Sequence, residues 1–277
     1  MATFFLGVSY SDNHRFVKSH YTIYSEKLAK DFRMAVLSDL HGNVYGKDNK
    51  KLIDAVKRSR PDLILIPGDL ITGEGTFEVV QMLALVKKLS MICPVYMSPG
   101  NHECKVKWMS SRFSYTYKEL LERIQDAGAT VLDNETLFLP QYNMEIKGLT
   151  LPESYFRKEM DISLRQQDLH SYVGKIREER FTLLSAHNPE YFDSYADYGA
   201  DLTISGHLHG GIVRLPKVGG VISPKYVLFP PYTYGKFSKN GYQMLVSRGL
   251  GSHTIPLRVF NPGELMIVDV RQVEKKR

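Results

Sequence analysis

Cysteine and long hydrophobic runs are both scarce in this sequence of 277 residues. Its two cysteines, Cys93 and Cys104, cannot form the disulfide framework of a small secreted domain, and we expect both to pack inside the protein rather than bind metal. The apolar stretch at residues 4–8 is far shorter than the about 20 residues that span a bilayer. It also lacks the charged region and the cleavage site of a signal peptide. These absences predict a cytoplasmic or membrane-associated protein without an intact signal peptide or transmembrane helix.

Internal repeats, low-complexity segments and a clear domain linker are absent as well, so we expect a single domain over residues 1–277. The hydrophobic fraction of 43% and the charged fraction of 24% are ordinary and allow a sizeable core. Residues 1–20 show no clear pattern, and we expect them to be irregular. They are interpreted either as an N-terminal extension or as the remnant of a membrane anchor, and the latter would favour peripheral membrane association.

The formal net charge of +6 suits anionic partners such as phosphate esters, nucleic acid or acidic headgroups. Basic clusters such as residues 57–58 and 87–88 lie on helix-like stretches among acidic residues, which favours an ordinary solvated surface. The sequence shows no recognition helix, basic stripe or regularly interleaved aromatic residues. We therefore expect no specific binding of nucleic acid.

Short apolar runs alternate with helical patterns along the first part of the chain. This rhythm predicts strands joined by crossover helices, and hence a largely parallel sheet. The expected helices cover residues 48–59, 77–89, 118–127 and 163–173, and Val79, Val80, Leu83 and Val86 are expected to face inward. We expect residues 104–117 to be irregular, with aromatic side chains that either pack on the domain or form a flap beside the site. The expected strands are residues 21–24, 33–38, 63–66, 95–97, 181–186, 202–205, 243–247 and 265–270, with 130–132, 136–139 and 142–148 as antiparallel strands that begin a second sheet.

Five polar blocks follow predicted strands, at residues 38–41, 67–69, 100–103, 186–188 and 206–209. In open α/β sheets, ligands bind at the carboxyl ends of the strands. The Asp, Asn and His side chains in these blocks are oxygen and imidazole donors, which suit Mn, Zn or Fe rather than metals that prefer thiolates. The blocks therefore predict a two-metal site built by five loops.

The blocks read Asp-x-His, Gly-Asp, Gly-Asn-His-Glu, His and Gly-His-x-His in this order, and the chain thereby resembles the calcineurin-like metallophosphoesterase superfamily. Single blocks are weak signals, whereas five in order span most of the chain. The resemblance implies an α/β fold in which two mixed β-sheets, flanked by helices, form a four-layer α/β/β/α sandwich. The second block lacks the further aspartate of Gly-Asp-x-x-Asp, which argues against the Ser/Thr protein phosphatase branch. Residues 210–216 and 247–251 resemble the YkuE- and YaeI-like branch of bacterial phosphodiesterases.

The resemblance also implies two divalent metal ions, for which Mn is favoured over Zn or Fe. It assigns a bridging role to Asp69. One metal ion would be completed by Asp39, His41 and His209, and the other by Asn101, His187 and His207.

The resemblance makes His102 the general acid that protonates the leaving alcohol, while a hydroxide between the two metal ions attacks phosphorus in line. The ordinary pKa of histidine suits this role. The alternative for His102 is a hydrogen-bond partner of the ligands. Glu103 is expected to hold the loop.

These features favour a metal-dependent phosphohydrolase, and among phosphohydrolases a phosphodiesterase with a phosphoester substrate. The alternative is a hydrolase of a lipid- or envelope-linked substrate, similar to UDP-2,3-diacylglucosamine pyrophosphatase, which the loop of Tyr, Phe and Pro over residues 224–237 suggests. A catalytically silent binding module would be expected to lose ligands, and this chain retains all seven. The substrate-binding residues are not predicted.

Overall fold

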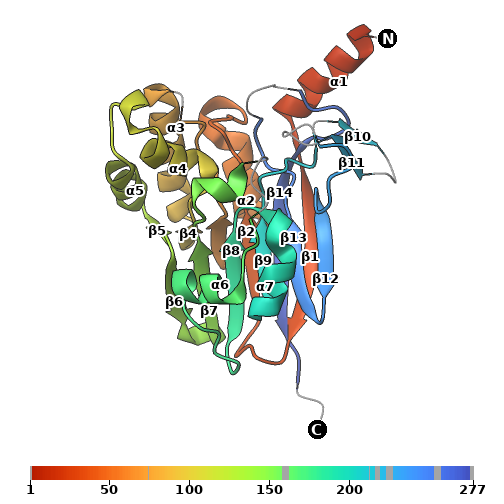
Figure 1. The fold of residues 1–277 in the computed structure, drawn as a ribbon. Helices are drawn as coiled ribbons and strands as arrows, with labels where there is room; N and C mark the ends of the chain where they lie inside the picture. The colour runs from red at the N-terminus through yellow and green to blue at the C-terminus, as the bar shows by residue number, and fades with distance from the viewer. Residues whose placement is uncertain are drawn as a thin grey trace.

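A computed structural model of the chain describes residues 2–73, 75–157, 162–211, 213–215, 219–222, 227–252 and 257–274. Two mixed six-stranded sheets face each other and carry helices on their outer faces, as Figure 1 shows. This arrangement confirms the predicted four-layer sandwich. The layers meet because each sheet has two apolar faces, and a cluster of buried residues from both sheets, including Met34, Leu65, Ile146 and Leu183, fills the space between them.

The first sheet has the order β1-β14-β2-β3-β4-β5. Strand β14 runs antiparallel to β2, and the other neighbouring pairs are parallel. The strands are β1 (Phe16–Ser25), β2 (Phe32–Val36), β3 (Leu63–Ile66), β4 (Val95–Met97), β5 (Ala129–Val131) and β14 (Gly263–Gln272). The prediction that residues 130–132 begin the second sheet is wrong. Residues 130 and 131 lie in β5, parallel to β4, because the intervening helices return the chain to the same sheet as a crossover connection.

The second sheet has the order β12-β13-β9-β8-β7-β6. Its central strands β7, β8, β9 and β13 are parallel, and the edge strands β6 and β12 are antiparallel to their neighbours. The strands are β6 (Glu135–Leu139), β7 (Met144–Leu149), β8 (Phe181–Ala186), β9 (Leu202–Ser205), β12 (Gly235–Lys239) and β13 (Tyr242–Val246). A separate hairpin is formed by β10 (Val213–Leu215) and β11 (Gly219–Ile222). The predicted strands at 136–139, 181–186, 202–205 and 243–247 are thus confirmed within about one residue at each end.

Helices α2 (Lys50–Ser59), α3 (Thr76–Ser90) and α5 (Tyr117–Asp126) cover the first sheet, and α6 (Gln166–Val173) and α7 (Phe192–Tyr198) cover the second.

Val80 was expected to face inward but is 58% exposed. The expectation that residues 104–117 are irregular is also wrong in its first part, since α4 spans Asn101–Trp108. Helix α4 begins directly after Gly100 because the Glu103 carboxylate accepts the Gly100 N–H at 2.8 Å, which satisfies a donor at the start of the helix.

The N-terminal residues are regular, contrary to the prediction. Helix α1 (Ala2–His14) projects from the body of the protein, and β1 adds an edge strand to the first sheet beside β14 (Figure 1). The prediction of an edge strand at 21–24 is confirmed as part of β1. Hydrophobic periodicity did not predict helix α1, because this helix is fixed by buried polar residues, Ser9 and Asp12, rather than by an apolar stripe. None of the helices in the described ranges is long and apolar enough to cross a membrane.

Candidate metal centre

Five loops meet at one edge of the sandwich, where β2, β3, β4, β8 and β9 end. Five of the predicted ligands on these loops have left-handed backbone conformations, namely Asp39, His41, Asp69, His207 and His209, with φ between 45° and 69°. Residues other than glycine rarely adopt this region, and such strain concentrates at functional sites. The loops also approach each other closely, because a Cβ atom on Gly100 or Gly206 would collide with the carboxylate of Asp69 or Asp39. The backbone is therefore shaped to bring these side chains together.

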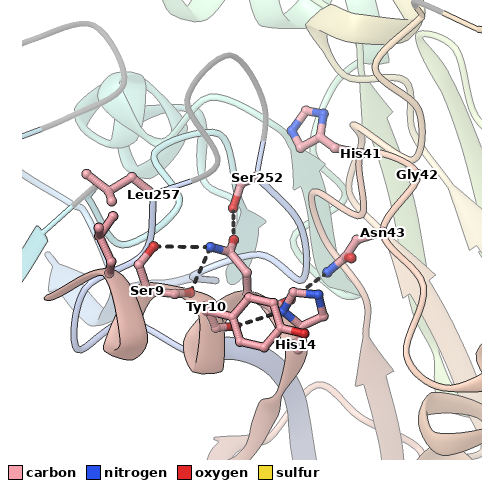
Figure 2. Close-up of a pocket in the computed structure, with 10 residues that line it drawn as sticks. Ser9, Tyr10, His14, His41, Gly42, Asn43, Ser252 and Leu257 are labelled. Carbon is pink, nitrogen blue, oxygen red and sulfur yellow. Dashed lines mark hydrogen bonds between the residues drawn. The ribbon is translucent and has the colours of Figure 1, made fainter. Parts of the chain in front are cut away.

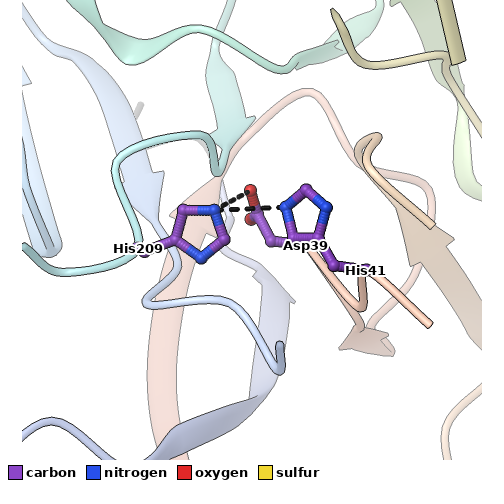
Figure 3. A group of neighbouring side chains, drawn as sticks. All are labelled: Asp39, His41 and His209. Atoms are coloured by element: carbon purple, nitrogen blue, oxygen red, sulfur yellow. Dashed lines mark hydrogen bonds and ion pairs between the residues drawn. The ribbon is translucent and has the colours of Figure 1, made fainter. Parts of the chain in front are cut away.

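The first cluster contains Asp39, His41 and His209, all buried (Figure 3). The Nε2 atoms of His41 and His209 lie 3.2 Å apart, and the distance from His209 Nε2 to Asp39 Oδ1 is 3.6 Å. The Asp39 carboxylate is held by the Ser38 hydroxyl and by the backbone N–H of His207, which donates to Oδ1 at 2.8 Å. Two imidazole nitrogens and a carboxylate oxygen thus converge on one point.

The second cluster contains Asp69, His187 and His207. Asp69 Oδ2 lies 3.0 Å from Nε2 of His187 and 3.5 Å from Nε2 of His41, so this carboxylate stands between the two clusters. Asn101 is the first residue of α4, directly after the loop that follows β4. Its side-chain oxygen is buried and accepts no hydrogen bond from the described residues. A buried acceptor without a donor is unfavourable in a folded protein, and a bound cation would satisfy it.

Hydrogen bonds on the outer nitrogens orient the imidazoles. Nδ1 of His187 lies 2.7 Å from the Pro67 carbonyl oxygen, and Nδ1 of His209 lies 3.0 Å from the Gly251 carbonyl oxygen. A carbonyl accepts the Nδ1 proton, so Nε2 of each ring faces the centre with its lone pair. This is the usual arrangement of histidine ligands and of the groups behind them. The donor set, its orientation and the Asn101 oxygen therefore fit divalent transition-metal ions.

Burial and the neighbouring charges shift the pKa values of the aspartates and histidines in the centre. Burial raises the pKa of Asp39 to about 6, and the charge of Asp69 adds to this effect. The pKa of Asp69 lies well below its usual range, because His187 and His102 overcome the opposing effect of burial. Asp69 in turn raises the pKa of His187 to about 9, again against burial. The two carboxylates thus attract positive charge, which protons or metal ions can supply.

His102 lies beside both clusters. Its backbone N–H donates to Asp69 Oδ1 at 2.9 Å, and its Nδ1 lies 2.8 Å from the Thr72 carbonyl oxygen. Its ring meets that of His41 edge to face, with the centroids 4.6 Å apart. Burial and the charge of Lys105 lower the pKa of His102, although Asp69 opposes them. The ring is therefore fixed next to the centre.

The loops are tied together by Glu103, as the sequence led us to expect. Its buried carboxylate accepts the backbone N–H groups of Asp69 at 2.9 Å, Gly100 at 2.8 Å and Ile71 at 3.2 Å. Glu103 thus joins the loop after β3 to the loop after β4.

Two supporting residues from the C-terminal part were not predicted. Arg258 is fully buried, donates to carbonyl oxygens that include those of Gly251 and Arg248, and places Nη2 3.5 Å from His209 Nδ1. The side chain of Asn261 donates to the carbonyl oxygens of His209 and Gly211 at 2.7 Å. Both residues shape the last metal loop, yet neither has a spacing in the sequence that could have marked it.

An aromatic contact beside the second cluster was also missed. The ring of Phe156 lies with its centroid 5.3 Å from that of His207 and 6.4 Å from that of His187, and Trp108 packs against Phe156 with the centroids 6.0 Å apart. Both alternatives for the aromatic residues in 104–117 therefore have support. Trp108 packs against Phe156 beside the second cluster, whereas Tyr115 packs into the core.

The fold and the Asp/His clusters define a metallophosphoesterase. Residues 32–211 match the family model described as calcineurin-like phosphoesterase, and the chain belongs to this family of hydrolases. It is 28% identical to the uncharacterized metallophosphoesterase YkuE of Bacillus subtilis, over 95% of this chain and 88% of YkuE. It is 24% identical to the phosphodiesterase YaeI of Escherichia coli, over 81% of this chain and 77% of YaeI. A purple acid phosphatase from yellow lupin has 12% identity and a TM-score of 0.44, with 82% of this chain and 46% of that chain covered.

Family membership implies divalent metal ions and a phosphoester substrate. The structure brings six of the seven predicted ligands into the two clusters, and it places Asn101 at the start of α4, next to His102.

Proposed function

We propose that the protein is a metal-dependent phosphodiesterase with a dinuclear centre. Asp39, His41 and His209 would hold one divalent ion, and His187, His207 and Asn101 the other. Asp69 would be shared, and its position between His41 and His187 is the observation that carries the proposal. When bound, two divalent cations neutralise the charge of a phosphate and supply Lewis-acid activation of water.

His102 would act as the general acid. Its Nδ1 lies against the Thr72 carbonyl, so Nε2, which is also 3.2 Å from Lys105 Nζ, is the atom that would deliver a proton to the leaving oxygen. The main-chain bond from His102 to Asp69 fixes the ring relative to the shared carboxylate. The burial that lowers the pKa of His102 makes its protonated form a stronger acid toward the leaving oxygen, which would depart as an alcohol, and it also reduces the fraction of His102 that is protonated at neutral pH.

The test combines activity with metal content. Protein expressed with supplemented Mn should contain two divalent ions per chain by elemental analysis, and should hydrolyse bis(4-nitrophenyl) phosphate faster than 4-nitrophenyl phosphate. Removal of the ions with a chelator should abolish turnover, and added Mn should restore it. Only traces of transition metal, or turnover that survives complete chelation, would contradict the proposal.

A second candidate is hydrolysis of a lipid- or envelope-linked phosphoester, similar to the reaction of UDP-2,3-diacylglucosamine pyrophosphatases. It is favoured by the exposed apolar side chains Phe5 and Leu6 of α1, since Leu6 lines a pocket together with His41 of the first cluster. Such residues would also favour peripheral membrane association. A panel that includes a pyrophosphate diester distinguishes the candidates, since cleavage between the two phosphates would favour the second.

A further inference from the structure

A cavity of about 600 Å³ lies between α1 and the loop that follows β2 (Figure 2). This volume falls within the range of small-molecule sites, about 300–1,000 Å³. On the body of the protein, its wall includes His41, Gly42 and Asn43. His41 belongs to the first metal cluster, so the cavity lies beside the candidate centre.

Helix α1 forms the opposite wall and is fixed in place by polar contacts. The backbone N–H of Asn261 donates to the buried carboxylate of Asp12 at 2.8 Å, and the N–H of Arg258 donates to the Ser9 hydroxyl at 3.2 Å. The Asn43 side chain donates to the Asn13 carbonyl oxygen at 3.3 Å. Arg258 and Asn261 also shape the loop of His209. The position of α1 is thus tied to the residues that support the candidate centre.

The chemistry of the lining differs from one end to the other. Near the centre it is polar, whereas Leu6, Tyr10 and Leu257 supply apolar surface along α1. Leu6 is 64% and Tyr10 70% exposed, and Phe5, just outside the cavity, meets the ring of Phe260. Among the described residues that line the cavity there is no Lys, Arg, Asp or Glu. Away from His14 and His41, the described lining is apolar or neutral and polar, which suits an uncharged group.

We propose that this cavity binds an uncharged, largely apolar arm of the phosphodiester. The phosphate would sit at the metal clusters, and the arm would run past His41 along Leu6, Tyr10 and Leu257. The inference rests on the proposed function and specifies its substrate class. Leu6 and Tyr10 are then specificity-determining residues, and α1 is a wall of the substrate site.

The test uses two esters that release the same 4-nitrophenol, methyl 4-nitrophenyl phosphate and octyl 4-nitrophenyl phosphate, below the micelle concentration. Each buried methylene contributes about 0.8 kcal/mol, and a tenfold preference requires only about 1.4 kcal/mol, the gain from roughly two of the additional methylenes. We expect kcat/KM to favour the octyl ester by at least about tenfold. The double variant Leu6→Ser/Tyr10→Ser should bring the ratio to about one. Its matched control is Tyr24→Ser, another exposed tyrosine, in β1, which should leave the ratio unchanged.

The outcomes separate this inference from the proposed function. Equal kcat/KM for both esters in the wild-type protein, or equal losses for both in the double variant, would overturn the role of the cavity while the phosphodiesterase activity stands. Turnover of neither ester would instead contradict the proposed function. The cavity is then tested by binding alone, because octylphosphonate should raise the melting temperature of the Mn-loaded protein more than methylphosphonate does. The absence of that difference overturns the inference.

Discussion

Glu103 is the residue whose replacement tests most directly how the metal loops are held. Its buried carboxylate accepts three backbone N–H groups, two of them at Oε2 from Asp69 and Gly100 and one at Oε1 from Ile71. A carboxylate has acceptor sites for all three donors, whereas a glutamine offers one oxygen and an NH₂ group. Glu103→Gln keeps the size and shape of the side chain but turns a donor toward at least one of the backbone N–H groups.

The expected loss of stability follows from the mismatch between this NH₂ group and the backbone N–H groups. A buried donor that loses its acceptor costs about 1–3 kcal/mol. We therefore expect Glu103→Gln to lower the free energy of unfolding by about 2 kcal/mol. For a domain of this size, about 2–4 °C of melting temperature corresponds to each kcal/mol, so the expected decrease is about 4–8 °C. Glu103→Ala should cost more, because all three donors lose their partner.

Thermal unfolding of the metal-free protein, followed by circular dichroism, measures this loss without a contribution from bound ions. Glu122→Gln is the matched control, because Glu122 is exposed on α5 and its ion pair with Lys118 spans 3.7 Å. Surface pairs of this kind contribute little, so the control should unfold at the wild-type temperature. An unchanged melting temperature for Glu103→Gln would refute the view that this carboxylate holds the two loops together.

Three further predictions concern the centre. Asp69→Asn should weaken the binding of both metal ions and abolish turnover, whereas Cys93→Ser and Cys104→Ser should retain metal and activity; the opposite pattern in elemental analysis would contradict the ligand assignment. His102→Ala should keep both ions but lose about 10²–10⁴-fold in kcat, with a smaller loss for nitrophenyl esters, whose leaving group scarcely needs a proton, than for alkyl esters. Equal losses would exclude the role of general acid. Because the pKa of His187 is raised to about 9, metal ions must displace its proton at pH 7, so Mn affinity should increase with pH from 6 to 8. Calorimetric titration that finds an affinity independent of pH would contradict this coupling.

The strands and the five polar blocks were predictable from the sequence. Each central strand is a short run buried on both faces, such as Leu63–Ile66, and such runs have a local signature. The polar blocks follow these strands directly, so the parallel order predicts a common edge within each sheet, whereas packing of the two sheets brings the blocks after β2, β3 and β4 to those after β8 and β9. The prediction of helix over residues 77–89 is confirmed for the same reason, since α3 is long enough for its apolar residues to mark it.

Other features depend on contacts between distant parts of the chain. The sheet that β5 joins is decided by the crossover that precedes it, and a three-residue strand carries no sign of its partner. Helix α1 is held by the backbone N–H groups of residues about 250 positions away, so its own sequence shows no apolar stripe.

The support of the candidate centre likewise emerged only from the tertiary structure. Arg258 and Asn261 act through main-chain carbonyls, which every residue possesses, so their partners leave no trace in the amino-acid sequence. The cavity beside His41 exists because α1 packs against the loop after β2. The Asp and His residues that cluster here could be named in advance because their motifs, in this order, resemble those of a known family. The cavity and its apolar wall are instead set by packing between segments far apart in the chain.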